Sequence, residues 1–328
     1  MARIHFRLMS ALLTAGALLC TVPAGAQATS YPAKPIRIVI GFAPGGATDI
    51  IARWVGEMIT QGTGQPVVVE SKSGAGGNIA ATTVASSAPD GYTLLMVTSS
   101  HITNRGLYEK LSYDPLKDFT GVSLIAKVPF LLVANPAFPG NTVVDVIETS
   151  RKTPGSLDYS TSGVGSSNHL TAEQFAREAG FEWKHIPYRG GAQAALAVIG
   201  GEVPLSLLST SQALPMVQKG QLKALGITSH ERSAALPGVQ TFAEASGVND
   251  YDGGTWFGLL APAGTPGEVI ALLHREIDKG LRTEELKRKF DAQGAIIVNS
   301  TPQAFNTLMR EEDERWYPLI RKLGITPQ

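Results

Sequence analysis

Residues 36–49 read I-R-I-V-I-G-F-A-P-G-G-A-T-D, and they introduce a pattern that recurs along the chain. The β-branched run at 36–40 predicts a buried parallel strand, because helices cover both faces of such a strand. A glycine- and proline-rich loop follows at 41–46, and a helix is expected to begin near Thr48 and Asp49. A strand, a glycine turn and a helix in this order direct backbone N–H groups into the space above the strand. Because a helix N-terminus carries about half a positive charge, such a turn is suited to binding an anion.

The first residues have the composition of a secretory signal peptide. Arg3 and Arg7 form a basic start, residues 8–22 are apolar, and small residues precede Ala26. This pattern predicts cleavage after Ala26, with Ala28 as the alternative, so residues 1–26 are expected to be absent from the mature protein. We therefore expect export to the periplasm of a Gram-negative bacterium.

Composition excludes several classes of function. Removing residues 1–26 takes away two of the 28 basic residues and none of the 28 acidic ones, which leaves a net charge of −2. A balance this close to neutral gives no reason to expect nucleic-acid binding. Cys20 is the sole cysteine and leaves with the signal peptide, so disulfides and thiolate chemistry are excluded. An exported chain without cysteine fits a bacterial periplasm better than a eukaryotic extracellular space.

Strands and helices are expected to alternate through most of the chain, as in a doubly wound α/β fold with mostly parallel sheets. After the first unit, strands are expected at 67–69, 92–97, 130–133, 157–160, 183–186, 205–208 and 222–227. Helices are expected at 78–87, 142–149, 167–178, 193–199, 214–219 and 268–292, and a last one begins with Thr301 as N-cap and Pro302 at its first position.

Two segments have the character of crossings between lobes. One is the apolar run 130–133, and the other is 256–262, which follows a glycine- and aspartate-rich loop. If the chain leaves the first lobe at one and returns at the other, lobe 1 comprises 27–130 plus 256–328, and lobe 2 comprises 131–255.

The candidate ligand-binding residues lie in loops that follow the predicted strands. The first-lobe loops 41–46 and 98–101 have counterparts at 160–169, 188–191 and 209 in the second lobe. These candidates are Phe42, Ala43, Pro44, Gly45, Gly46, Asp49, Thr98, Ser99, Ser100, Ser162, Gly163, Gly165, Ser166, His169, Tyr188, Arg189 and Ser209. The alternative for each is a structural role: a tight turn without ligand, a helix cap such as Ser166, or a solvated arginine at 189. Loop 73–78 (S-G-A-G-G-N) has the same two interpretations.

Catalytic and cofactor motifs are weak by comparison. Loop 41–46 has neither the Lys-Ser/Thr of a P-loop nor the G-x-G-x-x-G spacing of a dinucleotide site. Ser99 with His101, or Ser166 with His169, would be the nucleophile and base of a secreted hydrolase, the alternative from another class, but no G-x-S-x-G surrounds either serine. The histidines show no metal-binding spacing. We therefore expect no enzyme activity, no cofactor and no metal.

Together these segments resemble the substrate-binding proteins of tripartite tricarboxylate transporters, also called Bug proteins. The matching segments cover essentially the whole mature chain: Y-P-A-K-P-I (31–36), G-F-A-P-G-G-A-T-D (41–49), V-V-V-E (67–70), G-A-G-G-N (74–78), A-P-D-G-Y-T-L-L-M (88–96), Y-D-P-L-K-D-F (113–119), Y-S-T-S-G-V-G-S (159–166), H-I-P-Y-R-G (185–190), L-K-A-L-G-I-T-S (222–229) and A-P-A-G-T-P (261–266).

The resemblance implies a two-lobed periplasmic-binding-protein fold of type II, with a ligand cleft between the lobes. It implies that a ligand carboxylate is held by the loops that correspond to 42–46 and 162–166, partly through ordered waters. The implied partners are a small organic acid and the inner-membrane permease of a tripartite tricarboxylate transporter, served by a monomer. A ligand sensor for a membrane receptor kinase would use the same closure and is the second alternative.

The chain departs from the family pattern at several positions. Pro204 replaces a frequent aspartate, Leu208-Ser209-Thr210 stands where an acidic or glycine position is often present, and Lys72-Ser73 replaces a common Arg-Pro. Because an acidic side chain in this part of the second lobe could bind a ligand's ammonium group, its absence favours a plain mono- or dicarboxylate, aromatic ones included, over an amino acid.

Overall fold

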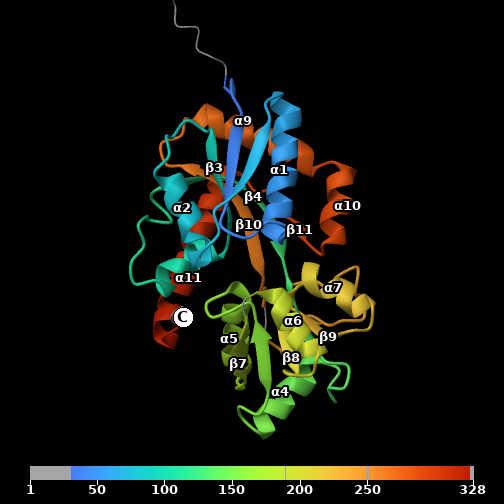
Figure 1. Cartoon of the computed structure of the whole chain (residues 1–328). Helices are drawn as coiled ribbons and strands as arrows, with labels where there is room; N and C mark the ends of the chain where they lie inside the picture. Colours follow the sequence, from blue (N-terminus) through green and yellow to red (C-terminus); the bar gives the residue numbers. More distant parts are fainter. Residues whose placement is uncertain (1–30, 189, 249–250, 326–328) are drawn as a thin grey trace, which may run out of the picture. The chain divides into compact units, whose positions relative to one another are not determined.

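The alternation of strands and helices is present throughout the computed structural model, which describes residues 31–188, 190–248 and 251–325 (Figure 1). The strands are β1 (Ile36–Ile40), β2 (Val67–Ser71), β3 (Thr93–Thr98), β4 (Phe119–Val128), β5 (Phe130–Ala134), β6 (Asp158–Thr161), β7 (Lys184–Pro187), β8 (Leu205–Ser209), β9 (Lys223–Ile227), β10 (Thr255–Pro262) and β11 (Ile296–Ile297). The helices are α1 (Ala47–Thr63), the 3₁₀ turn η1 (Ala75–Gly77), α2 (Asn78–Ala85), α3 (Ser100–Leu107), α4 (Val143–Lys152), α5 (Ser167–Ala179), α6 (Gly191–Ile199), α7 (Thr210–Gln218), α8 (Phe242–Ser246), α9 (Gly267–Leu281), α10 (Glu284–Ala292) and α11 (Pro302–Leu323).

These strands form two sheets, one in each lobe. The first has the order β11-β4-β10-β3-β1-β2 and the second has the order β7-β6-β8-β5-β9. The sheets are mixed, although the sequence predicts mostly parallel ones. The βα units pair in parallel, β1 with β2 and β3, and β6 with β7 and β8. Strands β10 and β5 pair antiparallel with their neighbours, because they carry the chain between the lobes and enter each sheet from the opposite end.

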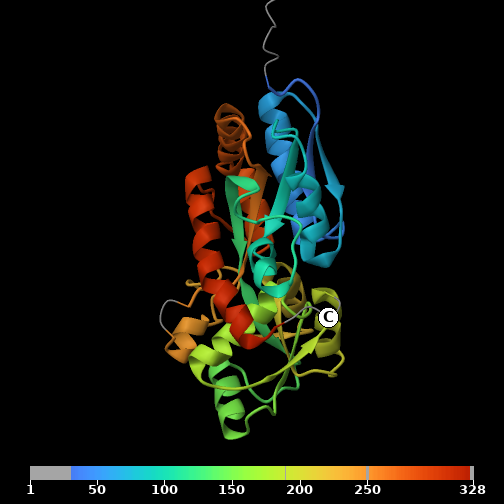
Figure 2. The same ribbon diagram turned by 90° about the vertical axis from the view of Figure 1, so that its left-hand side faces the viewer.

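Helices cover both faces of the first sheet. Successive side chains of a strand point to opposite faces of the sheet, so both faces carry apolar residues. On one face, Val39, Leu95 and Val97 pack with α2, α3 and α11. On the other face lie α1 and α9, which also contact each other. Figure 2 shows α11 (red) and α1 (blue) on opposite sides. The predicted Thr301–Pro302 start of the last helix is confirmed, since the Thr301 side chain accepts a hydrogen bond from the N–H of Ala304.

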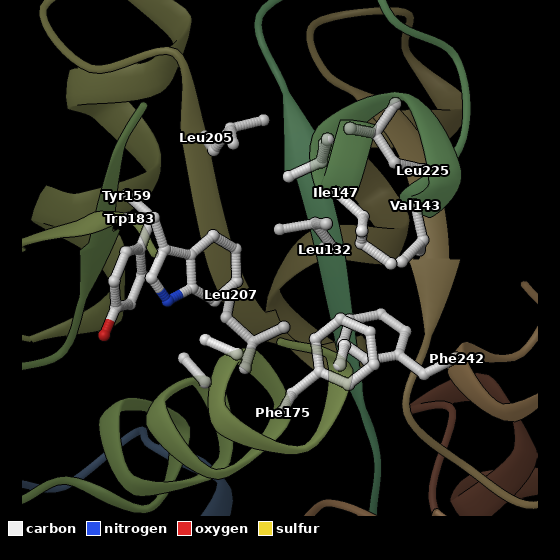
Figure 3. Close-up of a cluster of buried hydrophobic side chains, with 14 of the residues drawn as sticks. Leu132, Val143, Ile147, Tyr159, Phe175, Trp183, Leu205, Leu207, Leu225 and Phe242 are labelled. Atoms are coloured by element: carbon white, nitrogen blue, oxygen red, sulfur yellow. The ribbon is translucent and has the colours of Figure 1, made fainter. Parts of the chain in front are cut away.

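The second sheet is buried in the same way. Helices α4, α5 and α8 cover one face, where the tilted rings of Phe175 and Phe242 have centroids 4.3 Å apart and Tyr159 stacks on Trp183 (Figure 3). Helices α6 and α7 cover the other face through small side chains such as Ala194 and Ala213. Each lobe therefore has its own core, which is what a rigid-body movement of one lobe against the other requires.

The two segments that cross between the lobes lie side by side. Only Pro129 separates β4 from β5, and β10 begins at Thr255, which pairs with Val128 in the ladder. The Thr228 hydroxyl donates to the carbonyl of Gly253 (2.7 Å) and accepts from the N–H of Phe130 (2.8 Å). The lobe boundaries at 130/131 and 255/256 stay a prediction.

Several elements are not predicted by the sequence analysis, and β4 and α3 are two of them. Strand β4 contains Gly121 and Ser123, which weaken its strand pattern, and it is stabilised by pairing with β10. Helix α3 begins directly after β3 and contains few strong helix formers, so it depends on packing against α11. The expected single helix over 268–292 is in fact α9 followed by α10, because Thr283 caps a new helix.

The predicted signal peptide lies outside the described residues. Both sheets and the helices that cover them belong to one compact unit, which begins at Lys34. Among the described residues, no helix combines the length and the apolar composition that crossing a membrane requires.

The close contact between β10 and α11 gives a test of this packing. A Cβ on Gly258 would lie 2.1 Å from the ring of Phe305, which is fully buried, so Gly258→Ala should lower the free energy of unfolding by about 1–3 kcal/mol. Gly267→Ala is the control, since a Cβ there meets nothing within 4 Å. Urea denaturation measures the free energy of unfolding of both variants, and equal values would contradict the described packing.

Candidate functional site

The first-lobe loop between β1 and α1 is held by its own helix. Gly45 has φ +83°, a left-handed conformation that glycine adopts without strain, and its N–H donates to Oδ2 of Asp49 at 3.0 Å. Arg53 donates to the same oxygen at 3.1 Å. The hydrogen bond from Arg53, followed by that from Gly45, holds the pKa of Asp49 below its usual value although the carboxylate is buried. The Asp49 carboxylate is thus used within the loop, where it positions the turn.

The second-lobe loop between β6 and α5 repeats this arrangement. Gly165 also has a left-handed φ of +74°, and its N–H donates to Nδ1 of His169 at 3.0 Å. In both loops a left-handed glycine precedes the N-cap residue, and the side chain four residues after the glycine accepts its N–H. We call residues 42–46 and 162–166 the two jaw loops. The sequence analysis pairs these loops, but it does not foresee the shared hydrogen bond.

The helices that follow the candidate loops have no side-chain cap. Helices α1, α2, α3, α5, α6 and α7 begin at N-cap residues whose side chains make no capping hydrogen bond. Threonines cap α4, α8, α10 and α11, while α9 begins after Pro266 and is uncapped. The first N–H groups of a helix have no partner within it. The uncapped helices therefore offer hydrogen-bond donors at the carboxyl ends of the strands.

Three first-lobe candidates lie together. Phe42, Thr98 and Ser100 line one small cavity, and Ser100 shares a hydrogen bond with Thr98 at 2.8 Å. Asn104 closes this cavity, because its amide donates to the carbonyl of Gly76 (3.0 Å) and to Asn78 (2.7 Å). Loop 73–78 thus forms a wall beside the first jaw loop. Ala43, Pro44, Gly45 and Gly46 are exposed.

The second-lobe candidates are organised by a residue that the sequence analysis missed. Asn168 donates to the carbonyl of Leu207 (2.7 Å) and to the Ser162 hydroxyl (3.3 Å), and it accepts from the Ser166 hydroxyl (2.6 Å). The Ser166 hydroxyl also lies 2.6 Å from the carbonyl of Gly163. An asparagine two residues into a predicted helix is the only sequence signal for this role.

The other second-lobe candidates lie around this loop. Tyr188 follows β7, donates to Glu202 at 3.3 Å, and has its carbonyl beside Gly163. Ser209 ends β8 and shares a hydrogen bond with Ser211 at 3.1 Å. Arg189 lies outside the described residues.

Ser99 differs from its neighbours. Its hydroxyl lies 2.7 Å from that of Ser167 and 3.1 Å from that of Thr255, and the residue is 5% exposed. It lines a cavity of about 400 Å³ together with Trp256 and Trp316, and none of the other candidates that the structure describes borders that cavity. Ser99 therefore lies between the candidate loops and a separate space behind them.

The serine–histidine pairs of the hydrolase alternative are not formed. His101 is hydrogen-bonded through Nε2 to the carbonyl of Pro115 and lies between aromatic rings, while the Ser99 hydroxyl pairs with other hydroxyls. His169 Nδ1 accepts from Gly165, and the Ser166 hydroxyl bonds within its own loop. No group of three or more possible metal ligands occurs within the described ranges.

The structure places Pro204, which stands where related chains often have an aspartate, away from the candidate loops. Pro204 precedes β8, whereas Ser209 lies at the other end of that strand, five residues on and roughly 16 Å away at the usual strand rise. An acidic side chain at position 204 would therefore lie at the opposite end of β8 from the candidate loops.

Comparisons with known proteins agree with this architecture. The sequence profile of the family described as "Tripartite tricarboxylate transporter family receptor" matches residues 51–325. The solved structure of the periplasmic binding protein BugD is 32% identical, covers 91% of this chain and 100% of its own, and has a TM-score of 0.78. The R. palustris protein Rpa4515, solved with adipate, is 34% identical, covers 91% and 100%, and has a TM-score of 0.81. MatC from Rhodopseudomonas palustris, solved with bound malate, is 31% identical, covers 88% and 100%, and has a TM-score of 0.77.

Three histidines are buried or half-buried. His169 and His185 lie beside the second jaw loop, and His101 lies in the core of the first lobe. His169 stacks on His185 at 3.8 Å, and burial together with the charge of His185 lowers the pKa of His169 to about 3. Burial lowers the pKa of both His185 and His101 to about 4. In the folded protein these rings are therefore neutral at pH 5, whereas in the unfolded chain they take up protons near pH 6.5.

We predict that acid weakens this protein through these histidines. Because the unfolded state binds more protons, the free energy of unfolding is highest above pH 6.5 and falls as the pH drops towards 4, by about 2 kcal/mol per histidine at pH 5. In His169→Asn, the amide oxygen can accept the Gly165 N–H without titrating. Denaturant unfolding between pH 7.5 and 4.5 gives the free energy of unfolding as a function of pH. The slope of this curve should correspond to about one proton fewer in the variant than in the wild-type protein, and an unchanged slope would refute the assignment.

Proposed function

Because this chain belongs to the tripartite tricarboxylate transporter receptor family, we propose that it is a periplasmic solute-binding protein for a small dicarboxylate. The ligand is captured between the two lobes, which close on it by bending at the two crossing segments, with boundaries near 130 and 255. The closed protein then delivers the ligand to the membrane permease of a tripartite transporter. Export through the signal peptide of residues 1–26 belongs to the same proposal.

The observation that carries this proposal is the pair of jaw loops, each ending in an uncapped helix. Gly46 and Ser166 are the N-caps of α1 and α5, and neither makes a side-chain cap. A carboxylate at either position would accept the N–H groups that a cap normally satisfies. One hydrogen bond to a charged oxygen contributes roughly 1.5–3 kcal/mol, so three or four of them, less the ordering cost, support micromolar affinity.

The chemistry of the loops supports an anion held by neutral donors. Arg53 forms a salt bridge with Asp49, so its positive charge is paired within the first lobe. In the described part of the chain, the donors near the jaw loops include the hydroxyls of Thr98, Ser100, Ser162 and Ser209. Neutral donors release a ligand more readily than a bidentate arginine would, which suits a protein that must pass its ligand on.

A ligand with two carboxylates fits two equivalent jaws. We assign one carboxylate to the first-turn N–H groups of α1 and the other to those of α5. The adipate of Rpa4515 and the malate of MatC are both small dicarboxylates, which supports this class for the present chain. In this proposal Phe42, Ala43, Pro44 and Gly46 contact the ligand from lobe 1, and Gly163 and Tyr188 contact it from lobe 2. Asp49 and His169 hold the loops in place.

Installing the missing cap tests the site directly. Gly46 has an extended backbone that any residue can adopt, and a Cβ there would lie 3.6 Å from its nearest neighbour. The carboxylate of Gly46→Asp should cap α1 and stabilise the protein by about 0.5–1 kcal/mol. The same carboxylate would occupy the N–H groups and repel the ligand, so we expect dicarboxylate affinity to fall at least 100-fold in calorimetric titration.

Gly46→Ala is the matched control, because it adds a Cβ without a charge or a cap. It should lose no more than about fivefold in affinity. If Gly46→Asp binds dicarboxylates as tightly as Gly46→Ala, the first jaw does not hold a carboxylate.

The ligand class is tested by native mass spectrometry of the purified protein, followed by a thermal-shift panel of dicarboxylates, monocarboxylates, aromatic acids and amino acids. A ligand at 100 times its Kd stabilises the protein by about 2.7 kcal/mol, which a thermal shift detects. Stabilisation by amino acids but not by dicarboxylates would overturn the proposed class.

A further inference from the structure

The hydroxyl groups of Ser99, Ser167 and Thr210 connect the two lobes. On the side of α3 and α11, the Ser99 hydroxyl at the end of β3 meets that of Ser167, the first residue of α5, at 2.7 Å. Ser99 also meets Thr255, the first residue of the returning strand β10, at 3.1 Å. Ser99 is buried, so water competes little for these bonds.

A second contact joins the lobes on the side of α10. Thr210, the first residue of α7, donates its hydroxyl to the carbonyl of Gly294 at 2.7 Å, and its N–H donates to the carbonyl of Pro129 at 2.9 Å. Thr210 is 3% exposed. A Cβ on Gly294 would lie 2.8 Å from Cβ of Thr210, so this approach depends on the glycine. The second lobe is thus connected to the first on both sides of the crossing segments.

Apolar contacts reinforce the connection at α5. Leu170 packs in one cluster with Leu107 of α3 and with Trp316, Leu319 and Ile320 of α11. A Cβ on Gly165 would lie 2.7 Å from a methyl group of Leu107. The second jaw loop and the start of α5 therefore rest on helices of the first lobe.

Each hydroxyl contact lies one residue away from a residue of the proposed ligand site. Ser167 follows Ser166, Thr210 follows Ser209, and Ser99 lies between Thr98 and Ser100. A ligand that draws these loops together also brings each of these hydroxyls within hydrogen-bonding distance of its partner.

We propose that Ser99–Ser167 and Thr210–Gly294 are two clasps that hold the lobes in the closed arrangement, so that Ser99, Ser167 and Thr210 are positioning residues for binding. The inference rests on the proposed function and deepens it, because residues that do not contact the ligand then contribute to the binding affinity. The clasps form as the lobes close and break as they open.

The test measures the distance between the lobes with spin labels. Cys20 is the sole native cysteine, so a Cys20→Ser chain accepts labels at Gln61→Cys in α1 and Lys152→Cys in α4, both exposed positions. Pulsed electron resonance then gives the distance distribution without ligand and with saturating adipate. Stopped-flow fluorescence of Trp256 and Trp316, which line the cavity beside Ser99, gives the adipate dissociation rate.

The variants are Ser99→Ala, Thr210→Val and their combination. The combination should deplete the short-distance population in the ligand-free protein and raise the dissociation rate about tenfold, with smaller changes in each single variant. Ser206→Ala is the matched control, since its buried hydroxyl donates to the carbonyl of Ser160 within one lobe. It should leave the distance distribution and the dissociation rate unchanged.

Wild-type distances together with a dissociation rate within twofold of wild type in the double variant would overturn the clasps. The same holds if Ser206→Ala produces equal changes, because the effect would then reflect general loss of stability. If the wild-type protein binds no dicarboxylate, the proposed function fails, while the ligand-free distances still decide whether the clasps exist.

Discussion

A hydrogen bond from a left-handed glycine to the helix that follows it organises both halves of this protein. Gly45 donates to Asp49 and Gly165 donates to His169, at 3.0 Å in each case. The bond closes a tight turn between strand and helix and fixes where the first N–H groups of the helix point. The acceptor differs, a carboxylate in one lobe and a neutral imidazole in the other, but the geometry is the same.

The residue after each of these glycines leaves its helix uncapped. Gly46 has no side chain with which to cap α1, and the Ser166 hydroxyl bonds to Gly163 and Asn168 instead of to the first turn of α5. Elsewhere threonine caps α4, α8, α10 and α11. The uncapped starts of α1 and α5 are less stable alone and gain most from an anion. Neutral histidines under the second jaw keep a competing positive charge out of the loop.

The jaw loops could be predicted because their signals are local. A β-branched strand, glycines and a helix start within fourteen residues specify a turn with a defined direction, and the same pattern recurs near residue 160. Asn168 and Asn104 were missed, because their partners are carbonyls of β8 and of loop 73–78. Pro204 precedes β8, so it lies at the opposite end of that strand from the candidate loops.

The sequence by itself determined the α/β class, the two lobes and the glycine-rich jaw loops, since each depends on neighbouring residues or composition. Only the tertiary structure decided that the sheets are mixed, that Asp49 and His169 hold loops, and that Ser99 faces Ser167 and Thr255. The physical reason is distance along the chain. Ser99 and Thr255 are separated by 156 residues, so their contact depends on how β3, β10 and α5 pack, and no local pattern encodes it.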